Sequence, residues 1–224
     1  MLVRSWNLFH GRTLPSGARV QLREMVALAS NDRPDVLCLQ ELPLWALSQL
    51  DDWSGMTAVS AVAKRTLVPR WLGGILQRHD PRRFRSAVTG QANAILLAPT
   101  LVPLEHRSAR VSERGRERRV CHAVRLEGIV IGNVHASNEF TRPEVPRAEL
   151  KRAHELVDAM AASGEARVLA GDFNLRDPGL PGPNIDHIVV AGSEHGTLEV
   201  WPEGRRLHNG AVLSDHAPVE MRIG

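Results

Sequence analysis

At the end of one apolar run the chain reads Leu169-Ala170-Gly171-Asp172-Phe173-Asn174. The run itself, residues 166–170, predicts a buried strand by its length and composition. Gly171 and Pro178-Gly179 interrupt the pattern, so Asp172 and Asn174 are expected where this strand opens into a loop. Residues two apart in extended backbone point the same way, which would place a carboxylate and an amide together on the rim of a sheet. Asp and Asn are also ordinary turn residues, so this stretch alone leaves its function open.

Strand and helix patterns alternate before this stretch. Residues 2–8 predict a first strand, residues 17–31 a helix with Ser16 as its N-cap, and residues 35–41 a second strand. A strand–helix–strand unit of this length implies a parallel pair, buried on both faces, whose carboxyl ends meet at one rim. Asn7 and Glu41 close the two strands and are therefore expected to lie close together.

The remaining patterns predict one mixed α/β domain spanning residues 1–224. Helices are predicted at 43–52 and 144–162, a hairpin at 120–126 and 129–135, and further strands at 56–63, 92–97, 101–105, 185–190, 198–201 and 218–223. Residues 64–85 have no regular period and predict a loop. The apolar stretch 67–76 within it would contact lipid or a nucleic-acid groove, or simply pack on the surface.

Composition excludes several classes of protein. Hydrophobic residues make up 43% of the chain and charged residues 24%, which is ordinary for a soluble globular protein. No apolar run approaches the ~18 residues of a membrane-spanning helix, and Met1 leads directly into a strand pattern without a signal peptide. Cys38 and Cys121 lie in apolar runs and predict buried free thiols, so we expect a cytoplasmic protein. We also expect a monomer.

Positive charge is concentrated in two arginine-rich segments. Residues 64–85 hold seven Lys or Arg against one Asp, and residues 107–119 hold six Arg against two Glu. The whole chain has a net charge of only +3, so the rest of it is acidic. This asymmetry favours a polyanionic partner, nucleic acid or phospholipid, although a solvated arginine-rich surface would give the same counts.

Polar residues recur at the ends of the predicted strands. Strands that begin at a rim run antiparallel to strands that end there, so a mixed arrangement would bring all of these residues to one edge. The closing residues are Asn7, Glu41, His135 and Asp172, and the opening pairs are Asp186-His187 and Asp215-His216. Their carboxylate and amide oxygens suit Mg²⁺ or Mn²⁺, histidines can donate to a phosphate, and an Asp can activate water. The pattern predicts metal-assisted phosphoester hydrolysis.

Six motifs in this order resemble those of the endonuclease/exonuclease/phosphatase superfamily. They are Trp6-Asn7, Leu39-Gln40-Glu41, Asn133-Val134-His135, Gly171-Asp172-Phe173-Asn174, Ile185-Asp186-His187 and Ser214-Asp215-His216-Ala217-Pro218-Val219. The resemblance spans residues 6–219. It implies a four-layered α/β sandwich, in which two mixed β-sheets pack face to face with helices outside.

The resemblance also implies the metal ligands. Glu41 would be the principal ligand with Asn7 beside it, and Asp215 would complete the set for Mg²⁺ or Mn²⁺.

Six residues would take catalytic roles. Asp172 would align or activate water, and Asn174 would hold the phosphate. His216 would stabilise the phosphoryl oxygens, polarised by Asp215, and His135 would be a second phosphate donor. Asp186 would orient a catalytic histidine or assist the leaving group.

These roles predict a Mg²⁺-dependent phosphodiesterase that cleaves nucleic acid, bound through segments 64–85 and 107–119. The alternatives are a phosphomonoesterase, a lipid phosphoesterase of the inositol phosphate or sphingomyelin type, and a binding module without activity. Many nucleases of the superfamily place a tyrosine at the phosphate, whereas this chain contains none. We consider one of the arginines from Arg114 to Arg119 as the phosphate donor in place of that tyrosine.

Overall fold

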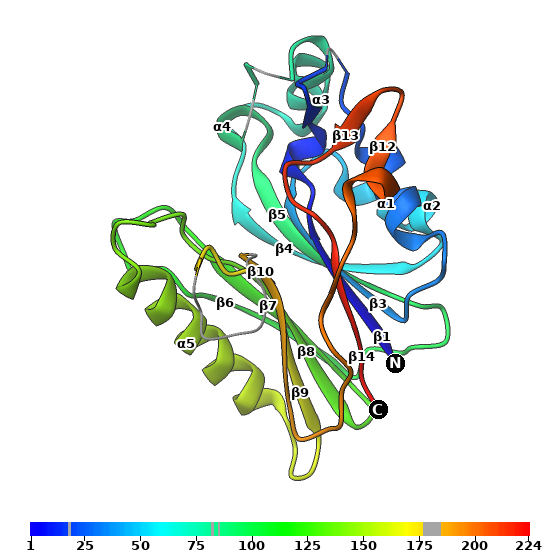
Figure 1. Ribbon diagram of the computed structural model, residues 1–224. Helices are drawn as coiled ribbons and strands as arrows, with labels where there is room; N and C mark the ends of the chain where they lie inside the picture. The colour runs from blue at the N-terminus through cyan, green and yellow to red at the C-terminus, as the bar shows by residue number, and fades with distance from the viewer. Residues whose placement is uncertain (18, 82, 85, 177–184) are drawn as a thin grey trace.

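Two large β-sheets form the centre of the protein (Figure 1). The structure is a computed structural model that describes residues 1–17, 19–81, 83–84, 86–176 and 185–224. The six-stranded sheet has the order β11 (Glu199–Val200), β14 (Val219–Arg222), β1 (Leu2–Asn7), β3 (Val36–Leu42), β5 (Gln91–Leu97) and β4 (Thr57–Lys64). The five-stranded sheet has the order β10 (Asp186–Ala191), β9 (Ala166–Asp172), β8 (Ile129–His135), β7 (Val120–Leu126) and β6 (Glu105–Arg110).

Helices cover the outer faces of the two sheets. α1 (Leu22–Ser30) and α2 (Leu50–Ser54) pack on the six-stranded sheet, and α5 (Glu144–Met160) runs along the five-stranded sheet (Figure 1). α3 (Arg70–His79) and α4 (Ser86–Thr89) lie together at the end of the molecule opposite the two termini (Figure 1). A small sheet of β12 (Leu207–His208), β13 (Ala211–Leu213) and β2 (Thr13–Leu14) completes the fold, with 3₁₀ turns at Phe9–Gly11, Leu47–Gln49 and Glu203–Arg206.

Side chains of the central strands alternate between the two faces of each sheet, and both faces are buried in the layered fold. In β3, Val36 and Cys38 join the core between the sheets, whereas Leu37 and Leu39 face α1 and α2. Val168 and Ala170 of β9 likewise enter the inter-sheet core, while Leu169 packs against α5. Side chains alternate across a strand, so a strand buried on both faces must be apolar throughout. The predicted four-layered α/β sandwich is confirmed.

Strand directions bring the strand ends to one rim, as predicted. β1 and β3 pair in parallel, with Asn7 opposite Gln40, and β8 and β9 pair in parallel, with His135 opposite Asp172. β10 runs antiparallel to β9, so that Asp186, at its start, lies opposite Asp172.

Two predicted elements are wrong. The strand at 101–105 is replaced by β6, Glu105–Arg110, a mostly exposed edge strand with too few apolar residues to give a signal. The loop at 64–85 contains α3, whose buried positions are Gly73, Gly74 and Gln77, while its apolar Trp71 and Ile75 are exposed. The buried face of α3 is therefore made of small and polar residues and its exposed face of apolar ones, the reverse of the pattern that predicts a helix from sequence.

The first helix is shorter than predicted. α1 begins at Leu22 and its N-cap is Gln21, so Ser16 does not cap it. The predicted free thiols Cys38 and Cys121 are both buried. In the described part of the chain no helix is long and apolar enough to cross a membrane. Arg82 and Arg85 of the first basic segment, and the Pro178-Gly179 break, lie outside the described residues.

Candidate active site

One cavity of about 770 Å³ opens at the rim where the two sheets meet. Strand ends of both sheets, together with the loop before β14, supply its walls. All eight predicted site residues line it, namely Asn7, Glu41, His135, Asp172, Asn174, Asp186, Asp215 and His216. The structure therefore brings together the residues that the sequence pattern placed at one rim, while their roles stay predictions.

Asp172 is held in place by two hydrogen bonds, one on each carboxylate oxygen. The backbone N–H of Asn174 donates to Oδ1 over 3.0 Å, and the side-chain amide of Asn7 donates to Oδ2 over 3.0 Å. Burial raises the pKa of Asp172 to about 7, Asp186 adds to the rise, and the amide donors oppose it. A carboxylate that gains or releases a proton near neutral pH is suited to general-base work.

Gly171 permits this position of Asp172. It has φ +143°, and a Cβ there would lie 1.8 Å from the backbone oxygen of Val134 in the parallel partner strand β8. Only glycine avoids that clash, so the backbone of β9 can approach β8 closely where the cavity begins.

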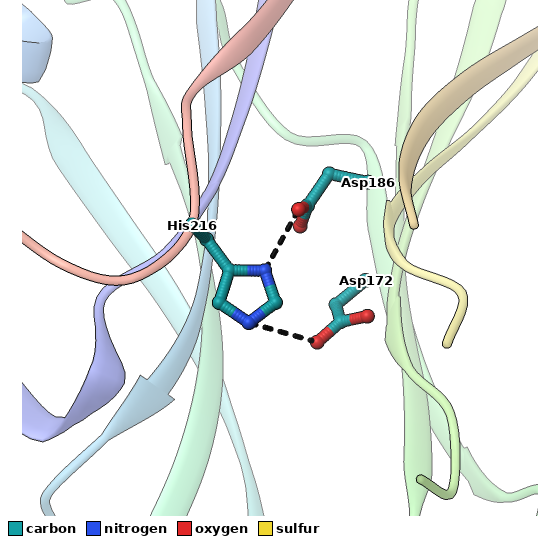
Figure 2. A group of neighbouring side chains, drawn as sticks. All are labelled: Asp172, Asp186 and His216. Carbon is teal, nitrogen blue, oxygen red and sulfur yellow. Dashed lines mark hydrogen bonds and ion pairs between the residues drawn. The ribbon is translucent and has the colours of Figure 1, made fainter. Parts of the chain in front are cut away.

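His216 and Asp186 form a hydrogen-bonded pair (Figure 2). Nδ1 of His216 donates to Oδ2 of Asp186 over 2.7 Å, and Nε2 lies 3.8 Å from Oδ2 of Asp172. Burial opposes the charge of His216, but Asp186 and Asp172 outweigh it and raise its pKa to about 10. We expected Asp215 to polarise this histidine, but its carboxylate lies 3.9 Å from Nε2, so the closest acidic partner is Asp186. His216 is thus an imidazolium donor at neutral pH.

Hydrogen bonds, most of them to its backbone carbonyls, fix the loop that carries His216. Arg206 Nη1 donates to the carbonyls of Leu213, Ser214 and His216, over 3.1, 3.1 and 2.9 Å. The indole of Trp6 donates to the same carbonyl of His216, and the Ser214 hydroxyl donates to the Asn7 carbonyl over 2.7 Å. These bonds tie the loop to the end of β1.

A β-bulge directs Glu41 into the cavity. The pairing of β3 with β5 shifts between Leu39 and Leu42, and Glu41 has φ +55°, in the left-handed region. Such irregularities re-aim a side chain at the edge of a sheet. The neighbouring Gln40 donates to Oδ1 of Asn133 over 2.8 Å, which connects the two sheets just below the rim.

His135 is a neutral imidazole beside a buried guanidinium. Burial, followed by the charge of Arg119, holds the pKa of His135 well below its usual range. Arg119 Nη1 lies 3.1 Å from each ring nitrogen, and the amide nitrogen of Gln91 lies 3.1 Å from Nδ1. Nε2 faces the acidic side chains, 3.5 Å from Asp172 Oδ2 and 3.9 Å from Glu41 Oε1.

A family model described as the Endonuclease/Exonuclease/phosphatase family matches residues 5–216. The chain belongs to this family. It is a phosphoesterase, and its Asp172, Asp186 and His216 group is consistent with a metal-dependent hydrolase. None of the curated proteins matches the chain.

Solved structures share the fold over the whole chain. A functionally unknown conserved protein from Enterococcus faecalis has a TM-score of 0.74 at 15% identity, covering 100% of this chain and 99% of its own. Truncated TDP2 from Caenorhabditis elegans has a TM-score of 0.68 at 16% identity, with coverage of 99% and 96%. A mannosyl-6-phosphatase from Bacteroides thetaiotaomicron has a TM-score of 0.68 at 14% identity, with coverage of 100% and 99%. At these identities the likeness shows the fold alone.

The rim of this family member can hold a divalent cation. Ligand atoms of Asp172, Asp186 and His216 lie within 4.8 Å of one another, but two of them already bond each other. Glu41 and Asp215 line the same cavity. Burial raises the pKa of Asp215, and the charge of Glu41 adds to the rise while the charge of His216 opposes it. A cation between these two carboxylates would relieve their repulsion, and the Oδ1 atom of Asn7 is a further hard donor.

Sequence reasoning missed several residues that line the cavity, Phe9, Phe140 and Arg176 among them, and did not single out three that contact the predicted site residues. Gln91 opens β5 and follows the same rule of polar residues at strand ends, so this signal was available. Arg119 lies within the arginine segment we considered, but only the fold distinguishes it from its neighbours. His10, whose Nε2 lies 3.5 Å from Glu41 Oε2, has φ +54° in a 3₁₀ turn and gave no pattern.

Proposed function

We propose that this enzyme is a Mg²⁺- or Mn²⁺-dependent phosphodiesterase that acts on nucleic acid. The observation that carries the proposal is the pairing of a phosphate-binding centre with aromatic walls in one cavity. Phe9 and Phe140 both line it, and each ring is stacked by a guanidinium, Arg12 at 4.3 Å and Arg176 at 4.6 Å from the ring centroid. Aromatic and guanidinium planes are the groups on which unpaired bases stack.

The polar groups of the cavity suit in-line attack of water on a phosphodiester. Asp172 would accept a proton from the attacking water, since Asn7 and the Asn174 backbone fix its oxygens. The water oxygen forms a bond to phosphorus as the bond from phosphorus to the leaving oxygen breaks. His216 would donate to the phosphoryl oxygens and can return a proton to the leaving oxygen.

Arg119 and the cation would balance the charge of the phosphate. Arg119 is buried and lines the cavity beside His135, which supports a role for it as a phosphate donor in this chain without tyrosine. A divalent cation held by Glu41, Asn7 and Asp215 would supply further positive charge to the phosphate when bound. Hard oxygen donors favour Mg²⁺ or Mn²⁺ in that position.

A substrate panel tests the proposal. The enzyme, with Mg²⁺ or Mn²⁺, is assayed on single-stranded DNA, RNA, plasmid DNA, bis-p-nitrophenyl phosphate, p-nitrophenyl phosphate, an inositol polyphosphate and sphingomyelin, with His216→Ala as the control for contaminating activity. We expect cleavage of nucleic acid and of the small diester. Turnover confined to the monoester, the inositol phosphate or sphingomyelin would contradict a nucleic-acid phosphodiesterase.

A further inference from the structure

The two arginine-rich segments, distant in sequence, lie side by side in the fold. β4 packs against β7, and Ala61, Ala63 and Val120 form a small buried cluster between them. At the surface Lys64 Nζ lies 3.8 Å from Glu117 Oε1. The segments therefore share one face of the protein rather than forming two separate patches.

A basic groove of about 600 Å³ runs between these segments. Arg65, Thr66 and Arg70 line it from one side, and Ser108 and Arg118 from the other. Arg118 is exposed and directly precedes the buried Arg119, which lines the catalytic cavity. Two consecutive residues, Arg118 and Arg119, thus line the groove and the catalytic cavity, which connects the two spaces through the backbone.

The groove continues into a pocket of about 430 Å³ that is rich in tryptophan. Arg70 lines both spaces, and the pocket adds Trp45, Trp53, Trp71 and Arg78. Trp71 is 66% exposed, which is unusual for so large an apolar side chain.

Helix α3 builds this pocket through two glycines. A Cβ at Gly74 would lie 3.1 Å from Cγ of Trp45, and one at Gly73 would lie 3.1 Å from the carbonyl oxygen of Val88. The helix therefore packs closely on Trp45, whose indole donates to Gln77 Oε1 over 2.7 Å. Gln77 also donates to the carbonyl of His10 over 2.8 Å, which fixes the pocket relative to the catalytic rim.

We infer that this groove and tryptophan pocket bind the single-stranded continuation of the substrate. Phosphates lie along Arg118, Arg65 and Arg70, and an unpaired base stacks on Trp71. The inference rests on the proposed function because it extends the same substrate beyond the scissile phosphate. Guanidinium groups along a backbone track and aromatic faces for bases are the two components of single-strand binding. A base paired in a duplex cannot enter such a pocket, so an unpaired strand is required.

The concave shape of the tryptophan pocket favours a nucleic-acid strand over a lipid surface as its ligand. Trp45 and Trp53 are only partly exposed and line a hollow, where they cannot enter a bilayer. Among the described residues of segment 64–85, the large apolar side chains that are exposed are Leu67, Trp71 and Ile75, at 84%, 66% and 53%. These three side chains are the ones that a bilayer would contact, so the experiment must distinguish membrane binding from nucleic-acid binding.

The test measures binding of a fluorescein-labelled, phosphorothioate 12-nucleotide single strand by anisotropy over a salt series. Trp71→Ser should weaken binding by about 5- to 150-fold, the range for loss of one stacked base. Arg70→Ser with Arg118→Ser should weaken binding and lower the slope of log Kd against log salt by about 1.4, at about 0.7 per phosphate contact. Turnover of bis-p-nitrophenyl phosphate should stay unchanged in all variants, because it cannot reach the groove.

Matched controls remove comparable side chains elsewhere. Val102→Ser with Leu104→Ser removes exposed apolar groups, and Arg23→Ser with Arg147→Ser removes two exposed charges. Both should bind the oligonucleotide nearly as the wild type does. Equal weakening in the charge control and in the groove variant would overturn the inference.

Failure of the inference and failure of the proposed function give different results. If the wild type cleaves nucleic acid but Trp71→Ser binds the oligonucleotide normally, the groove inference fails and the function stands. If the wild type cleaves no nucleic acid, the proposed function itself fails. Loss of binding to phosphatidylglycerol vesicles in Trp71→Ser, with normal oligonucleotide binding, would assign the surface to lipid and overturn the inference.

Discussion

Asp186 is hydrogen-bonded to His216, and we expect its main effect on the reaction to pass through this histidine, which a double-variant experiment can test. Asp186 is 3% exposed, and its Oδ2 accepts the 2.7 Å hydrogen bond from Nδ1 of His216. Asp186→Asn keeps the shape and one oxygen acceptor but removes the charge that stabilises the imidazolium. We expect kcat to fall because the donor toward the phosphate is lost, while the apparent Mg²⁺ affinity stays constant.

The size of the effect follows from the geometry. Two unit charges about 4 Å apart interact by about 4 kcal/mol at the effective dielectric of a protein surface, which corresponds to about 10³ in rate. His216→Ala removes the donor itself and should lower kcat by about 10²–10⁴. In the His216→Ala background, Asp186→Asn should cost less than about threefold, because groups that act as a unit are not additive.

Steady-state kinetics on bis-p-nitrophenyl phosphate measure all four proteins of this cycle at saturating Mg²⁺. Circular dichroism and thermal unfolding confirm that each variant is folded. Multiplicative losses would refute the reasoning, since Asp186 would then act independently of His216. A raised Mg²⁺ requirement in Asp186→Asn would likewise assign Asp186 to the metal.

Three further predictions concern the metal, pH and backbone. Glu41→Gln should weaken Mg²⁺ binding at least ~10-fold, measured by calorimetry as well as by activity, because the charged ligand is lost. Burial lowers the pKa of His122 from 6.5 to about 4, so protonation favours the unfolded chain as the pH falls through that window. The wild type should lose up to about 3 kcal/mol there relative to His122→Leu, by urea unfolding at pH 7 and pH 4.5. Gly171→Ala should destabilise by more than about 3 kcal/mol, whereas Gly128→Ala, with open space at its Cβ, should cost about 1 kcal/mol.

The sheets were predictable because their strands are buried on both faces. β3 is apolar from Val36 to Leu39 before the polar Gln40 and Glu41, and β9 is apolar except for Arg167 until it ends on Asp172 at the rim. Parallel pairing then follows from the helix between β1 and β3. The convergence of the predicted site residues at one rim was predictable as well, because strand direction decides which strand ends meet. A monomeric state and a cytoplasmic location stay predictions.

Elements that owe their position to surface packing were not predictable. β6 is an edge strand of polar residues, and α3 buries glycine and glutamine while exposing tryptophan. Hydrophobic periodicity carries no information where the buried positions are small or polar. Both elements lie in the arginine-rich segments, so the surfaces that we assign to substrate binding are those with the weakest local signal.

Side-chain partners at the rim depend on backbone conformations that no motif encodes. Phe9, His10, Glu41, Asn174 and Ser214 all have positive φ, between 49° and 62°, and all lie at or beside the cavity. L-residues occupy that region only when surrounding bonds enforce it. The Gln40–Asn133 bond supplies this constraint below Glu41, and the Ser214–Asn7 bond supplies it beside His216. Removing the Ser214–Asn7 bond should therefore disturb catalysis before it disturbs folding, whereas removing the buried Gln40–Asn133 bond between the sheets should lower stability as well.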